Sequence, residues 1–203
     1  MTTVATITET LPSLNLSTAT ANGANHDSEE PYAYAHLLPT FDPSVRYPPL
    51  IPFRHEDPGR RALSHPDPIS FLHAASRVQQ LTPYLGTEIE GVNLAKLSSD
   101  ERDQLALLVA QRGLVVFRGQ EEFINAGPNN YLEWGRHFGR LHIHPTSGQP
   151  AGVPEIHLVY RDEHTTFGFD YDDNINSIRW HSDVSYELQP PGLTTFFLLS
   201  QRK

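Results

Sequence analysis

Hydrophobic and polar positions in the middle of the chain predict a strand, a helix and a second strand. Residues 84–92 (YLGTEIEGV) alternate and carry glycines near both ends, which is typical of a short strand or hairpin arm. Ser98 and Glu101 have the spacing of a capping box. Leucines at helical spacing follow until Gly113, which is placed to end the helix. Residues 114–117 (LVVF) then predict a buried strand, so we expect a scaffold that packs against a main sheet.

The pattern continues with a second helix and more strands. The helix is predicted over residues 131–138, with Asn129 or Asn130 as its cap and Gly139 at its end. Apolar or alternating segments predict three strands, over residues 141–145, 155–160 and 193–200. Residues 161–177 are acidic with interspersed aromatics. A segment of that length favours a lid or binding loop. The alternative is a solvent-exposed loop without a functional role.

The N-terminal third differs in composition from the rest. Residues 1–45 lack periodicity and predict a disordered tail, and residues 46–80 predict a Pro-rich extended leader. Much of the chain's 17 prolines and its low hydrophobic content of 38% come from this region. Residues 81–203 are expected to hold the folded domain. Its predicted elements are mainly β with flanking helices, an α+β class.

Charge and cysteine content exclude several functions. A net charge of -9 argues against binding to nucleic acid and to anionic membranes. The sequence has no apolar run long enough to span a membrane and no secretory signal pattern at its start. The absence of cysteine excludes a disulfide framework and a cysteine-based zinc site. We therefore expect a cytoplasmic protein.

Three His-x-Asp patterns are candidates for metal binding. They occur at residues 55–57, 65–67 and 181–183. The histidine and aspartate content of the chain makes such matches common by chance. The first two run into prolines. The third, His181 and Asp183, lies in a strand-like run, where positions i and i+2 share a face. That pair would supply two thirds of the 2-His-1-carboxylate triad that holds Fe(II).

A second pair of alternating histidines is His142 and His144. One interpretation is a His-x-His metal site of the kind found in metal-dependent hydrolases. The other is a strand end with one packed and one solvent-facing histidine. Pro145 would end the strand and place His144 at the rim of a sheet, where sites tend to lie.

From about residue 81 to the end, the sequence resembles the TauD/TfdA family of Fe(II)- and 2-oxoglutarate-dependent dioxygenases, in particular its alkylsulfonate (taurine-type) branch. The matching segments, in order, are residues 85–94 (LGTEIEGVNL), 113–118 (GLVVFR), 138–145 (FGRLHIHP), 180–186 (WHSDVSY) and the Pro190–Pro191 turn.

The resemblance implies a double-stranded β-helix (jelly-roll-like) core that binds Fe(II) through His181 and Asp183. It implies substrate contacts from His144 and Val184, and a covering role for the loop before residue 180. The expected reaction uses O2 and converts 2-oxoglutarate to succinate and CO2. Meanwhile a small alkylsulfonate or sulfate ester is hydroxylated and releases sulfite and an aldehyde. The expected partners are the substrate and O2, without nucleic acid or membrane, and the full-length protein could form a homo-oligomer.

The sequence also departs from the family pattern. The third iron ligand, a distal histidine, and the 2-oxoglutarate-binding arginine are expected beyond Lys203. We therefore expect a truncated chain that is inactive alone. Ser147 stands where taurine enzymes have a substrate-contacting tyrosine, so a broader sulfonate or sulfate-ester specificity is an equal alternative to taurine.

Two hypotheses of other classes stay open. The chain could be a non-catalytic fragment that serves as a binding or regulatory module. It could also be a zinc hydrolase that uses the histidines and carboxylate named above, His142, His144, His181 and Asp183.

Overall fold

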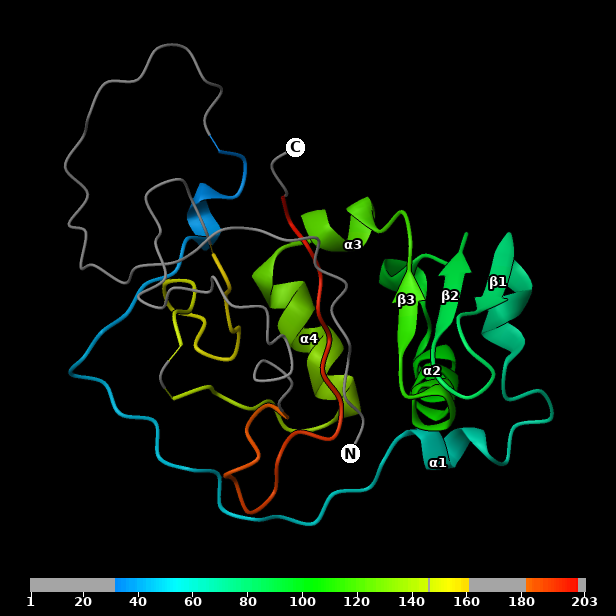
Figure 1. The fold of residues 1–203 in the computed structure, drawn as a ribbon, viewed down its shortest axis with the longest axis horizontal. Coiled ribbons are helices and arrows are strands. Elements are labelled where there is room, and N and C mark those ends of the chain that lie inside the picture. Colours follow the sequence, from blue (N-terminus) through cyan, green and yellow to red (C-terminus); the bar gives the residue numbers. More distant parts are fainter. Residues whose placement is uncertain (1–31, 146, 161–181, 201–203) are drawn as a thin grey trace, which may run out of the picture.

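A computed structural model describes residues 32–145, 147–160 and 182–200 (Figure 1). Its α-helices are α1 (Gly59–Ala62), α2 (Ser99–Arg112), α3 (Glu121–Asn125) and α4 (Pro128–Phe138). Its strands are β1 (Arg77–Gln80), β2 (Thr87–Glu90) and β3 (Val115–Phe117). Short 3-10 turns lie at η1 (Ala35–Leu37), η2 (Ser70–Ala74) and η3 (Leu94–Lys96). None of the helices in these ranges is long and apolar enough to cross a membrane.

The strands form one mixed sheet in the order β1-β2-β3. β1 pairs antiparallel with β2, with Val78 opposite Ile89. β2 pairs parallel with β3, with Thr87 opposite Val115, and α2 makes the crossover that a parallel pair requires. The predicted strands over 84–92 and 114–117 are thus confirmed as β2 and β3. β1 is exposed along its length, which explains why its polar sequence gave no strand signal.

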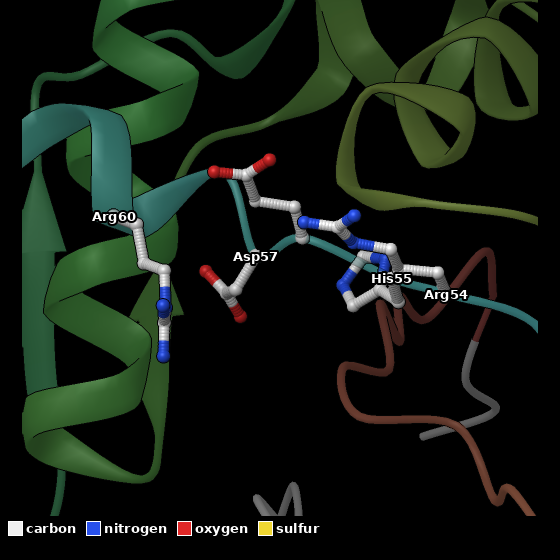
Figure 2. A pocket seen from close by; sticks show the side chains of 5 residues that line it. Arg54, His55, Asp57 and Arg60 are labelled. Carbon is white, nitrogen blue, oxygen red and sulfur yellow. The ribbon is translucent and has the colours of Figure 1, made fainter.

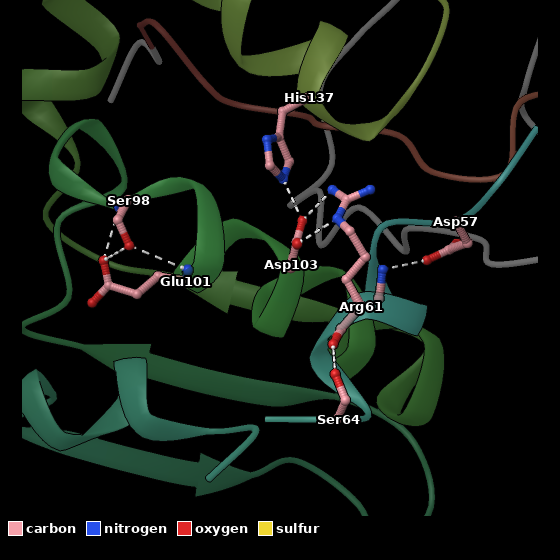
Figure 3. A network of polar contacts seen from close by, with 8 residues as sticks. Asp57, Arg61, Ser64, Ser98, Glu101, Asp103 and His137 are labelled. Carbon is pink, nitrogen blue, oxygen red and sulfur yellow. Dashed lines mark hydrogen bonds and ion pairs between the residues drawn. The ribbon is translucent and has the colours of Figure 1, made fainter. Parts of the chain in front are cut away.

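Helix α2 begins and ends as the sequence predicts. The Glu101 backbone N–H donates to the Ser98 hydroxyl at 3.3 Å, and the Ser98 backbone N–H donates to the Glu101 carboxylate at 2.8 Å (Figure 3). This reciprocal pair satisfies amides that have no partner inside the helix. Gly113 ends the helix with φ 68°, a left-handed conformation that glycine adopts without a steric penalty.

Helix α4 ends at Gly139 as predicted but begins earlier than expected. Its N-cap is Gly127, with Pro128 in the first turn and no side-chain capping bond. The prediction that Asn129 or Asn130 caps this helix is therefore wrong. The physical reason is local: proline at the first helical position has no N–H to satisfy and its fixed φ fits the helix.

The core lies between the sheet and helices α2 and α4. Ile89 of β2 is fully buried there, and Phe71 joins it from the Pro-rich segment. On the α4 side the core is aromatic. The rings of Tyr131 and Phe197 lie 4.7 Å apart between centroids, so the C-terminal segment runs along α4 (Figure 1). The leader therefore contributes a helix, a strand and a core residue, which its proline spacing did not predict.

Three of the predicted strands are not formed. Residues 141–145, 155–160 and 193–200 have no ladder partner, and the described part of the fourth strand-like run, 182–186, is largely a turn. Alternation marks chain with one packed face, but a strand also needs a neighbour to accept its backbone bonds. Between residues 141 and 160 the structure records one isolated bridge, Thr40 to Gln149. The described residues thus form a small mixed sheet with helices, and a double-stranded β-helix stays an expectation.

Candidate active site

A folded-back segment gathers histidines that lie apart in the sequence. After α4 the chain forms a turn in which the Val153 backbone N–H donates to the carbonyl of Pro150 at 3.0 Å. Pro150 is fully buried, and the Leu158 N–H donates to the carbonyl of Gly148 at 3.0 Å. These contacts return residue 157 to the vicinity of residue 144.

His144 and His157 form the centre of this cluster. Their rings lie 4.8 Å apart between centroids with an interplanar angle of 36°. The hydroxyl of Ser147 lies 2.7 Å from Nδ1 of His144. His144 is half-buried. His157 is exposed, although its ring packs against the ring of His144. His144 was predicted at a strand end on the rim of a sheet, but residues 141–145 form no strand, and His144 lies on a loop beside a second imidazole.

Asp183 acts on both rings. Burial lowers the pKa of His144, His142 lowers it further, and the Asp183 carboxylate opposes both effects. Burial and His144 likewise lower the pKa of His157 against the opposing influence of Asp183. The carboxylate is therefore close enough to influence both imidazoles, which are mainly neutral at pH 7. A neutral imidazole offers one N–H donor and one acceptor.

Val184, the predicted substrate contact next to Asp183, has an unusual backbone. Its φ is 55°, and it is the one non-glycine residue with positive φ among those the structure describes. A β-branched residue in this region is strained, and such strain concentrates at functional sites. The Glu187 N–H donates to the carbonyl of Val184 at 3.1 Å, so the strained residue lies inside a closed turn.

His142 points to a different partner. Its Nε2 lies 3.5 Å from Oε1 of Glu187, and both side chains are nearly buried, with 13% and 5% of their surface exposed. This is the packed member of the His142–His144 pair. Among described residues, no group of three or more histidine, aspartate or glutamate side chains could hold a metal. His181, the other half of the predicted iron pair, lies outside the described residues.

The other His-x-Asp patterns serve elsewhere. A pocket of about 380 Å³ is lined by residues 54–57 and Arg60 (Figure 2). The labelled side chains, Arg54, His55, Asp57 and Arg60, are exposed and carry charges of both signs. At the second pattern, His73 pairs with Asp67 at 3.1 Å on the surface. At neither pattern do the side chains point toward a common position where a single ligand could bind.

Sequence reasoning missed His157. Residues 155–160 were interpreted as a strand, and nothing in that pattern predicts a ring placed on His144. The signal that was present is one histidine among apolar neighbours, EIHLVY, at a position where a buried strand would disfavour it.

Imidazoles on loops, within the electrostatic influence of a carboxylate, define a candidate anion-binding enzyme site. Comparison with known proteins supports this class: the model for "Taurine catabolism dioxygenase TauD, TfdA family" matches residues 77–203. The chain belongs to the TauD/TfdA family, which confirms the resemblance.

Relatives agree with this assignment. The chain is 48% identical over 169 residues to an "Alpha-ketoglutarate-dependent sulfonate dioxygenase" of Saccharomyces cerevisiae, covering 80% of this chain and 40% of that protein. It is 38% identical to "Alpha-ketoglutarate-dependent dioxygenase cnsP" of Penicillium expansum, covering 82% and 44%. It is 39% identical to "Alpha-ketoglutarate-dependent dioxygenase cnsM" of the same species, covering 82% and 46%. The chain thus spans less than half the length of these relatives.

Proposed function

We propose that this chain carries part of the active site of an Fe(II)- and 2-oxoglutarate-dependent dioxygenase that acts on an alkylsulfonate or sulfate ester. A sulfonate would give an aldehyde and sulfite, and a sulfate ester would give an aldehyde and sulfate, with succinate and CO2 formed from 2-oxoglutarate in both cases. The observation that carries the proposal is His144, in contact with Ser147 and influenced by the Asp183 carboxylate, within the family-matched residues. The name of the yeast relative supports the sulfonate.

The donor types suit Fe(II). His181 would supply an imidazole and Asp183 a carboxylate oxygen, a pair typical of non-haem Fe(II) sites that leave positions open. When bound, the iron would supply the oxidative chemistry with 2-oxoglutarate and O2. The third iron ligand and the 2-oxoglutarate-binding arginine would come from outside these 203 residues. We therefore assign the activity to the protein expressed from its complete reading frame, here called the full-length protein.

His144 would bind the anionic head group of the substrate. If the Ser147 hydroxyl donates to Nδ1, the proton of the neutral ring resides on Nε2, which can then donate to a sulfonate oxygen. Serine at position 147 is much smaller than tyrosine, so the space beside the head group would admit substrates larger than taurine. Val184 would contact the substrate from the strained turn next to the metal ligand.

The test is release of succinate together with sulfite from alkylsulfonates, or with sulfate from sulfate esters, by the full-length protein with Fe(II), 2-oxoglutarate and ascorbate. We expect both products in equal amounts, and only with O2. The same assay on the 203-residue chain alone should show little turnover, because two protein ligands hold Fe(II) weakly. Ester or amide hydrolysis with bound zinc and no oxygen uptake would instead support the hydrolase hypothesis.

A further inference from the structure

His157 packs on His144 without belonging to the predicted site. The two rings are close and tilted by 36°, so they are neither coplanar nor in a parallel stack. Its neighbour Ile156 packs against the hydrophobic core. His157 itself is exposed.

Core packing does not explain a histidine at this position. A residue that served only to fill space would be apolar and buried, whereas His157 is polar and exposed. Besides burial, the titratable groups that shift the pKa of His157 are His144 and Asp183. His157 is therefore close enough to the proposed metal ligand, Asp183, to be influenced by its charge. The position places a second imidazole beside the one expected to bind the substrate.

We propose that His157 is a substrate-binding residue that donates a hydrogen bond to the anionic head group held by His144, and so sets the affinity for sulfonate or sulfate substrates. This inference rests on the proposed function. A sulfonate presents three oxygens that diverge from sulfur, so two neighbouring imidazoles can each donate to a different oxygen. Hydrogen bonds to a charged group are the stronger kind, which gives the second donor a measurable effect.

Two substitutions separate binding from packing. His157→Phe keeps an aromatic ring against His144 but removes both ring nitrogens. His157→Gln loses the ring but keeps an N–H donor. The control is His73→Phe, an exposed histidine of η2 whose Nε2 lies 3.1 Å from an Asp67 oxygen. All are made in the full-length protein, and circular dichroism and thermal unfolding verify the fold.

Binding is measured by calorimetric titration with hexanesulfonate in the presence of 2-oxoglutarate and without O2, alongside steady-state kinetics. We expect His157→Phe to weaken hexanesulfonate binding about tenfold or more, with the KM for 2-oxoglutarate unchanged. His157→Gln should retain more affinity than His157→Phe, and His73→Phe should match the wild type.

The outcomes distinguish the two proposals. Wild-type affinity in His157→Phe, or a wild-type protein that binds no hexanesulfonate, would overturn the role of His157. A variant that loses binding while the wild-type protein binds sulfonate without turnover would support His157 and refute the proposed reaction.

Discussion

His137 Nε2 lies 2.8 Å from Oδ1 of Asp103, and this contact joins α4 to α2 (Figure 3). Arg61 of α1 donates from its Nε to Oδ2 of the same carboxylate at 2.6 Å. The Asp103 side chain is 8% exposed and that of His137 is 11% exposed. One buried carboxylate thus fixes the helix that leads into the histidine segment, because α4 ends just before residue 141.

Removal of the Asp103 carboxylate should destabilise the fold. Asp103→Ala leaves the His137 ring nitrogen without its partner in a nearly buried position, and Arg61 loses its partner as well. We expect a loss of about 2–3 kcal/mol in the free energy of unfolding, since Arg61 is half-exposed and can recover water. Urea denaturation measures it. Glu133→Ala, an exposed carboxylate on α4, is the control and should change stability little.

The same carboxylate predicts acid sensitivity. Burial raises the pKa of Asp103, but hydrogen bonds from Arg61 and His137 outweigh burial and leave the pKa below its ordinary value. The folded-state pKa lies below the unfolded value of about 3.9, so its stabilising effect is complete above that value. The effect is lost as the pH falls through the folded-state pKa.

Unfolding measured from pH 6 to pH 3 checks this sign. The wild-type free energy of unfolding should fall at the acid end more steeply than that of Asp103→Asn, which has no proton to bind there. Equal slopes in the two proteins would show that Asp103 does not contribute to acid denaturation.

How far the sequence predicted the structure depended on the range of the contacts involved. Helix α2 was predicted because its signals, the Ser98–Glu101 box and Gly113, act within one turn. Predictions failed where a distant partner decides: residues 155–160 alternate like a strand but have no ladder neighbour. Arg77–Gln80 is polar yet pairs with β2. In the candidate site, His144 was found from a local motif. The His157 contact was not, because it depends on the turn around Pro150.

We predict that substitution of Asp183 causes loss of metal binding. Asp183→Asn in the full-length protein exchanges an anionic ligand for a neutral amide. Loss of a direct ligand should exceed the roughly 10–100-fold effect typical of outer partners. Anaerobic titration with Fe(II) and analysis of bound iron measure it. Asp67→Asn, a partly exposed carboxylate in a His-x-Asp pattern away from the site, should bind iron like the wild type. Retained iron in Asp183→Asn would contradict the proposed ligand.

We predict that replacing Val184 by glycine raises stability and lowers substrate affinity. Its φ of 55° is strained for a β-branched side chain, and glycine has no Cβ to clash in that region. Val184→Gly should therefore raise the free energy of unfolding by up to about 1 kcal/mol, a gain reduced by the greater freedom of glycine in the unfolded chain. The same change removes the side chain proposed to contact the substrate, so the KM for an alkylsulfonate should rise. Val184→Ala separates the two effects, because it keeps the strain and loses the contact. If Val184→Gly raised stability and left KM unchanged, the strain would be real but the side chain would not bind substrate.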